Sequence, residues 1–155
     1  ALNDALFVIS DVAELPKMVP GGGAIETELS KAVRSYATQV GGREQLAIEA
    51  VADALEVIPR TLAENAGLDI LDSMVAIKAA HDKKGGSSMG VNVYDEGVID
   101  MLEQGVVEPM AVKLQAIKSA VEVSAMILRI DDVLAATSPG GMGGPGGPPG
   151  DMDDM

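Results

Sequence analysis

The stretch Val19-Pro20-Gly21-Gly22-Gly23-Ala24-Ile25-Glu26 organises the rest of the chain. Three glycines follow a proline and lead directly into a long helical pattern. Glycine accepts positive φ angles and has no side chain, so the backbone turns tightly here and another group can come close. The following helix directs its free N–H groups and the positive end of its dipole back at this turn, which favours an anion. The alternative is a plain hinge between two helices.

The composition predicts a mainly helical domain. The 155 residues are enough for one domain with a core. Residues are 47% hydrophobic but only 2% aromatic, so Ala, Val, Ile, Leu and Met must fill that core, which suits packed helices. The absence of cysteine excludes a disulfide scaffold. A net charge of -13 argues against binding to nucleic acid or an anionic membrane, and no apolar run is long enough to span a bilayer.

Apolar residues at helical spacing predict six helices, over residues 1–15, 24–40, 43–57, 60–65, 70–83 and 109–126. Pro16 ends the first helix, and Gly41 with Gly42 caps the second. Pro59 is expected to begin a separate short helix, because proline fits a first helical turn. Since the chain begins at Ala1 inside a helical pattern and without an initiator methionine, we expect it to be a piece of a longer protein.

The period changes after the fifth helix. Alternating residues predict a short strand over 89–94, followed by a short apolar segment of uncertain type over 98–102, so we place short strands near residues 89–101. Residues 127–130 also alternate and are expected to form a brief strand. The tail over residues 136–155 consists mostly of Gly, Pro, Met and Asp, and is expected to be disordered because it has little to bury.

Besides the glycine turn, three places are candidates for chemistry. The carboxylate of Asp4 can orient or deprotonate water, or hold Mg²⁺, although helical aspartates are mostly solvated groups or caps. The amide of Asn92 offers a donor and an acceptor to a base edge, with Val93 beside it, and the alternative is an ordinary hairpin strand. Glu108 can accept from ribose hydroxyls, and the alternative is a charge at a helix start.

His81 is the one histidine of the chain. Without cysteine or a second histidine, carboxylates would have to supply every other ligand of a zinc site, so no metal site is predicted. Its place near a helix C-terminus predicts a surface residue that the helix dipole favours.

Four motifs in this order and spacing resemble the archaeal group II chaperonins, the thermosome family. The motifs are Asn3-Asp4-Ala5-Leu6, then residues 19–29 around the glycine turn, then Gly90-Val91-Asn92-Val93, and then Gly105-Val106-Val107-Glu108-Pro109. The resemblance covers the whole chain and corresponds to the C-terminal part of such a subunit. It implies that residues 1–18 end the intermediate domain, residues 19–135 form the C-terminal half of the equatorial ATP-binding domain, and residues 136–155 are a flexible tail.

The resemblance also implies roles for single residues. Asp4 matches the aspartate that positions or activates the water attacking the γ-phosphate. Residues 21–23 (Gly21, Gly22 and Gly23) match the glycine turn against the ribose and adenine, and Asn92 with Val93 matches the lining of the adenine pocket. Glu108 matches the acidic residue that holds the ribose hydroxyls, and residues 127–130 match a strand shared with the neighbouring subunit.

The family's Gly-Asp-Gly-Thr-Thr phosphate motif, with its Mg²⁺-binding aspartate, is absent from this sequence. The resemblance implies that the full-length subunit is an ATP- and Mg²⁺-dependent ATPase of a cytoplasmic chaperonin. Because this motif is absent, the Mg²⁺ ligand is expected outside this chain and the isolated piece is expected to be inactive. Its expected partners are neighbouring identical or paralogous subunits in a double ring and unfolded protein substrates, with no nucleic acid and no membrane. The competing hypothesis is a non-enzymatic acidic helical module for oligomerisation.

Overall fold

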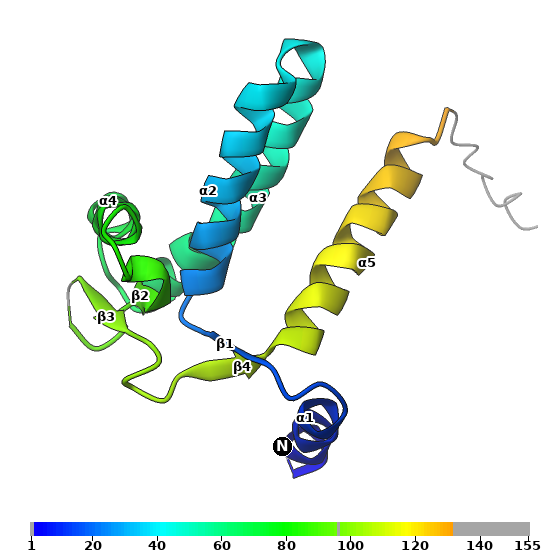
Figure 1. Cartoon of the computed structure of the whole chain (residues 1–155). Helices are drawn as coiled ribbons and strands as arrows, with labels where there is room; N and C mark the ends of the chain where they lie inside the picture. The colour runs from blue at the N-terminus through cyan, green and yellow to red at the C-terminus, as the bar shows by residue number, and fades with distance from the viewer. Residues whose placement is uncertain (1, 96, 132–155) are drawn as a thin grey trace, which may run out of the picture.

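The computed structural model describes residues 2–95 and 97–131 (Figure 1). It confirms a mainly helical fold with short strands between residues 89 and 101. In chain order the elements are α1 (Leu2–Glu14), β1 (Met18–Pro20), α2 (Ala24–Val40), α3 (Gly42–Asn65), α4 (Ile70–His81), a short 3₁₀ turn η1 (Gly86–Ser88), β2 (Met89–Val91), β3 (Val98–Asp100), β4 (Val107–Pro109) and α5 (Met110–Leu128).

Helices α2 and α3 form a long antiparallel hairpin that rises from the strands (Figure 1). The predicted start and end of α2 are confirmed, and Gly41 separates the two helices. The predicted break at Pro59 is wrong, because α3 runs unbroken from Gly42 to Asn65 with Pro59 inside it. Proline removes one intrahelical hydrogen bond, but Pro59 is fully buried and packs closely against Gly23, and this packing favours the continuous helix.

Two small antiparallel sheets join distant parts of the chain. In the first, β1 pairs with β4, and Val19 lies opposite Glu108. In the second, β2 pairs with β3, and Gly90 lies opposite Ile99. The β1–β4 pairing was not predicted from the sequence, and it brings Glu108 to the strand that enters the glycine turn.

The hydrophobic core lies where α3, α4 and β2 meet. Ala63, Met74, Ile77 and Val91 are buried together there. Because these side chains are small or flexible aliphatic groups, helix and strand approach closely, as the scarcity of aromatic residues predicted.

A buried ionic network links α2, α3 and α4. Only 1% of the Glu56 side chain is exposed. Its Oε1 accepts from the Ser30 hydroxyl at 2.9 Å and from Arg34 at 3.0 Å, and its Oε2 accepts from Lys78 at 2.9 Å and Arg60 at 3.4 Å. Desolvation opposes the charged carboxylate, but the hydrogen bonds from Lys78, Arg34 and Ser30 outweigh it and lower the pKa of Glu56 to about 2.

His81 is buried, so its prediction as a surface residue is wrong. Its Nε2 donates to the Met89 carbonyl at 2.8 Å, and its Nδ1 lies 2.7 Å from Oε2 of Glu28. The imidazole therefore connects α4 with α2 and β2. Dipole arguments treat the helix by itself and do not register these tertiary partners.

The end of α5 corrects another prediction. Residues 127 and 128 are helical and Arg129 caps the helix, so the strand expected over residues 127–130 is not formed. A strand is stable only with a partner, and within the chain the helical hydrogen bonds are available locally. The predicted tail, residues 136–155, lies outside the described residues.

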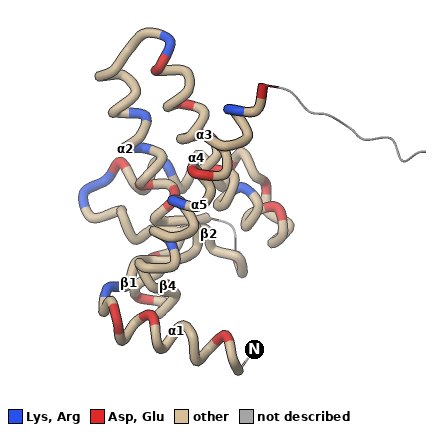
Figure 2. The backbone as a smooth tube through the Cα atoms, turned by 90° about the vertical axis from the view of Figure 1, so that its right-hand side faces the viewer, with Lys and Arg blue, Asp and Glu red and all other residues tan. Residues whose placement is uncertain are grey.

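Helix α1 packs against α5 and β4 and carries acidic but no basic residues (Figures 1 and 2). Its apolar residues are largely exposed, with Leu2, Leu6, Phe7 and Ile9 all above half of their free surface. Among the described helices, none is long and apolar enough to cross a membrane.

Candidate functional site

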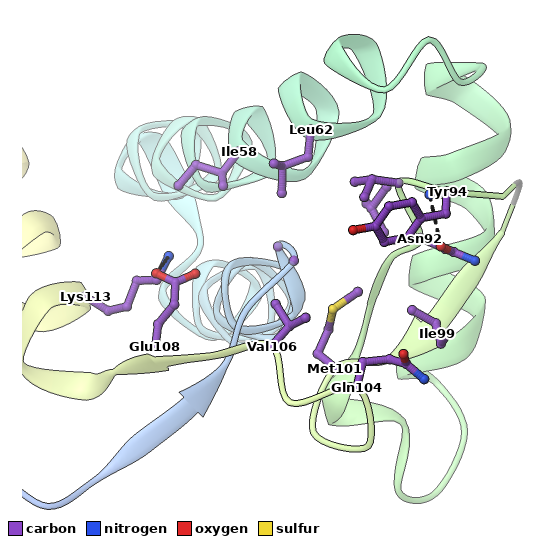
Figure 3. Close-up of a pocket in the computed structure, with 14 residues that line it drawn as sticks. Ile58, Leu62, Asn92, Tyr94, Ile99, Met101, Gln104, Val106, Glu108 and Lys113 are labelled. Carbon is purple, nitrogen blue, oxygen red and sulfur yellow. Dashed lines mark hydrogen bonds and ion pairs between the residues drawn. The ribbon is translucent and has the colours of Figure 1, made fainter. Parts of the chain in front are cut away.

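A cavity of about 510 Å³ opens where the glycine turn meets the two small sheets and α3 (Figure 3). Its lining is largely apolar, with a few polar groups at the margin, as in pockets for small organic ligands. The lining residues are Gly22 and Gly23; Ile58 and Leu62 of α3; Val91, Asn92, Val93 and Tyr94; Ile99, Met101, Gln104 and Val106; and Glu108 with Lys113.

The glycine turn forms one wall of this cavity. Gly22 and Gly23 have φ angles of 61° and 78°, which residues with a side chain rarely adopt. A Cβ on Gly22 would lie 2.6 Å from Cε of Met101, and one on Gly23 would lie 2.7 Å from Cβ of Pro59. The backbone conformation therefore favours glycine at both positions, and at Gly23 the close packing against Pro59 favours it as well.

Backbone hydrogen bonds hold the turn on both sides. The N–H of Gly21 donates to the Val106 carbonyl, and the N–H of Val91 donates to the Gly22 carbonyl, each at 2.9 Å. Helix α2 begins immediately after the turn, so the positive end of its dipole lies beside the cavity. These anchors favour a preformed binding surface over the free hinge that the sequence left open.

The segment after β2 contributes Asn92, Val93 and Tyr94 to the opposite wall. The side-chain oxygen of Asn92 accepts from the backbone N–H of Tyr94 at 3.2 Å (Figure 3). This bond supports the turn and leaves the amide N–H₂ of Asn92 as the group with free capacity. Tyr94 also lines the cavity, although 92% of its surface is exposed.

Three charged groups meet at the other end of the cavity. The ammonium of Lys113 lies 2.8 Å from Oε2 of Glu108 and 2.6 Å from Oε1 of Glu26. Glu108 is placed here by the β1–β4 ladder, and its Oε1 lies 3.2 Å from the position that a Cβ on Gly21 would occupy. Glu108 therefore adjoins the glycine turn, as the predicted ribose contact requires.

The structure brings together most of the predicted site. Gly22, Gly23, Asn92, Val93 and Glu108 all line the cavity, although they come from three distant segments.

Gly21 is not among the lining residues, although a Cβ on it would lie only 3.2 Å from Oε1 of Glu108. Asp4 is an exposed residue of α1 and is not among the lining residues.

Sequence reasoning missed several lining residues. Met101 resembles any other core methionine in the sequence, yet it fills the space left by Gly22 and Gly90. Lys113 also escaped notice, because its partners Glu26 and Glu108 belong to other elements. Its place in the first turns of α5, where a cation opposes the helix dipole, is the signal that the sequence did contain.

A sequence profile of the TCP-1/cpn60 chaperonin family matches residues 1–138. The chain is similar to a thermosome subunit of Methanocaldococcus jannaschii, with 57% identity over 91% of this chain and 26% of that protein. It is also similar to the thermosome subunit alpha of Thermoplasma acidophilum, with 55% identity over 92% of this chain and 27% of that protein. The chain thus spans about a quarter of the length of these relatives.

The fold matches a solved structure described as the open-state monomer of a group II chaperonin from Methanococcoides burtonii. The TM-score is 0.76 and the identity is 53%, over 83% of this chain and 32% of that one. Sequence and structure agree: the chain belongs to the TCP-1/cpn60 chaperonin family.

Proposed function

We propose that this chain forms the adenosine side of the ATP site of a chaperonin subunit that hydrolyses ATP. The observation that carries the proposal is the cavity in which the glycine turn, Asn92, Val93 and Glu108 meet. Its apolar lining suits a purine, and Glu108 at its margin is an acceptor for ribose hydroxyls. The α2 N-terminus beside the turn favours the negative charge of the phosphates.

Asp4 is proposed to act in the chemical step by orienting or deprotonating the water that attacks the γ-phosphate. Helix α1 contacts β4 and leads through β1 into the glycine turn, and this connection supports a role for Asp4 at the same site. Phosphoryl transfer of this kind depends on positioning and charge stabilisation.

The described part of the chain offers residues for part of an ATP site but not for a Mg²⁺ site. The volume of the cavity, about 510 Å³, and its apolar lining support the binding of an adenosine group, whereas the described residues contain no group of three or more His, Cys, Asp or Glu placed to hold a metal ion. We propose that the phosphate side and the Mg²⁺ ligand lie in other parts of a full-length subunit, because the sequence lacks the family's Gly-Asp-Gly-Thr-Thr motif. Within this proposal, residues 1–18 end the intermediate domain, and residues 19–135 form the C-terminal half of the equatorial domain.

At the level of the assembly, we propose that the subunit joins a double ring of identical or paralogous subunits in the cytoplasm. Hydrolysis would drive closure of the ring around non-native protein, because nucleotide contacts differ between open and closed states. The exposed apolar residues of α1 and α5 are available for contacts with the rest of the subunit or with neighbours.

The test uses a full-length subunit that contains this sequence and compares Asp4→Ala with wild type. We expect ATP binding to be retained and phosphate release to fall by about a hundredfold, the usual scale for loss of an acid–base group. Asp11→Ala on the same helix is the matched control and should hydrolyse ATP at the wild-type rate.

Unchanged hydrolysis in Asp4→Ala would remove Asp4 from the mechanism. Absence of ATP binding by the wild-type subunit would contradict the whole proposal and favour the oligomerisation module.

A further inference from the structure

Lys113 and its two carboxylate partners form a connected unit beside the cavity, here called the Lys113 clamp and defined by Glu26, Glu108 and Lys113. One partner, Glu26, lies in the first turn of α2, and the other, Glu108, lies on β4. Lys113 reaches both from α5, at 2.6 Å and 2.8 Å. The clamp thus joins three elements at the end of the cavity where the ribose contact is proposed.

Lys113 occupies a costly place for a cation. It lies near the N-terminus of α5, where the helix dipole disfavours positive charge, and its side chain is only 20% exposed. Burial favours the neutral amine, but the hydrogen bonds to Glu108 and Glu26 outweigh burial and raise the pKa of Lys113 above its usual value. The ammonium therefore stays charged and bound to both carboxylates.

Glu26 provides the fixed end of the clamp. Its side chain is 3% exposed and its Oε1 accepts from Lys113. Among the residues that the structure describes, its Oε2 is buried and has no hydrogen-bond partner. A buried carboxylate with one unsatisfied oxygen is a poor device for stability alone, because desolvation opposes it. The buried Glu26 carboxylate does, however, hold the Lys113 ammonium in one place.

Glu108 is the partly exposed member of the clamp. Its side chain is 39% exposed, so it would sample several rotamers without a partner. Lys113 contacts Oε2 of Glu108. Oε1 faces the glycine turn and lies 3.2 Å from the point where Gly21 would carry a Cβ, so the lack of a side chain at Gly21 gives this oxygen room. In Figure 3 one carboxylate oxygen of Glu108 lies beside the Lys113 ammonium and the other is directed towards the cavity. The two oxygens therefore have different environments.

We propose that Lys113, anchored by Glu26, is a positioning residue for nucleotide specificity: it fixes Glu108 so that Oε1 accepts from a ribose hydroxyl. This inference rests on the proposed function and adds to it a residue that selects nucleotides carrying ribose hydroxyls. When the Glu108 side chain is fixed before binding, the entropy cost of ordering it is not part of the binding step. The hydrogen bond from the ribose to this charged acceptor strengthens binding further, so the clamp contributes about tenfold in affinity.

The test measures dissociation constants of ATP and 2′,3′-dideoxy-ATP for a full-length subunit that contains this sequence. The double variant Lys113→Met with Glu26→Gln removes both charges together, so that neither is left buried and unpaired. We expect its dissociation constant for ATP to rise about tenfold while that for dideoxy-ATP stays within about twofold of wild type, so the preference for ATP disappears. Lys113→Arg, which keeps the charge, should preserve the preference.

Lys118→Met is the matched control, since Lys118 is an exposed lysine of the same helix, and both constants should stay at wild-type values. An unchanged preference for ATP in the double variant would overturn the clamp and leave the proposed function intact. An equal loss of affinity for both nucleotides would also overturn it, because it would indicate a general structural role. A wild-type subunit that binds neither nucleotide would refute the proposed function itself.

Discussion

Replacing Glu56 by Gln tests whether the buried network of α2, α3 and α4 holds the fold together. The carboxylate has an ordinary pKa of 4.5 and a folded pKa of about 2, a difference worth about 3 kcal/mol in favour of the charged form. Arg34 and Lys78 are 38% and 47% exposed, and solvent screens their charges, which reduces the expected effect to about 2 kcal/mol. Gln keeps the size of the side chain and removes the charge.

The assay is urea unfolding of the chain, followed by far-ultraviolet circular dichroism at a series of pH values. At neutral pH the free energy of unfolding should fall by about 2 kcal/mol in Glu56→Gln. Because the folded pKa is lowered, the wild-type advantage is complete above the unfolded value of 4.5 and is lost as the pH falls towards about 2. The two proteins should therefore converge in acid.

Glu64→Gln is the matched control, because Glu64 is an exposed glutamate of the same helix. Its effect should stay within about 0.5 kcal/mol at every pH. Two results would refute the reasoning: equal stability of Glu56→Gln and wild type at neutral pH, or a difference between them that persists unchanged in acid.

Two further substitutions test the close contacts of the fold. Gly23→Ala combines a φ of 78° with a Cβ placed 2.7 Å from Pro59, and should lower the free energy of unfolding by about 2 to 4 kcal/mol in urea unfolding; a wild-type midpoint would mean that the turn relaxes freely. His81→Phe keeps an aromatic ring but leaves the Met89 carbonyl without its donor and Glu28 without its contact to Nδ1. It should cost about 2 kcal/mol and accelerate amide hydrogen exchange in β2; unaltered exchange there would show that the imidazole does not hold the strand.

The sequence predicted well where a strong local signal met no opposing tertiary contact. Helix α2 begins and ends at the predicted residues, because a glycine turn and a glycine cap enclose a clear apolar period. The strand predicted over residues 89–94 from alternation forms over its first half, Met89–Val91. The residues assigned to the base and ribose are found around one cavity because their assignment came from the family resemblance, which carries three-dimensional information that spacing alone lacks.

The failures share a physical cause. Pro59 remains helical and His81 is buried because tertiary partners outweigh local preferences. Residues 127–130 are not a strand because alternation over four residues does not supply a neighbouring strand. Lys113 went unnoticed because it connects elements far apart in the chain. Local pattern cannot register a contact whose two halves are separated by most of the sequence.

The anchoring of the glycine turn also orders events while the chain is being made. The turn leaves the ribosome before Val91 and Val106, whose backbone hydrogen bonds fix it. Contacts between such distant segments form slowly and only after the later segment is available. A nascent chain that ends before β4 therefore contains the turn but not yet the cavity beside it. If the proposed function holds, nucleotide binding at this site marks chains that have been elongated past β4 and have closed the turn.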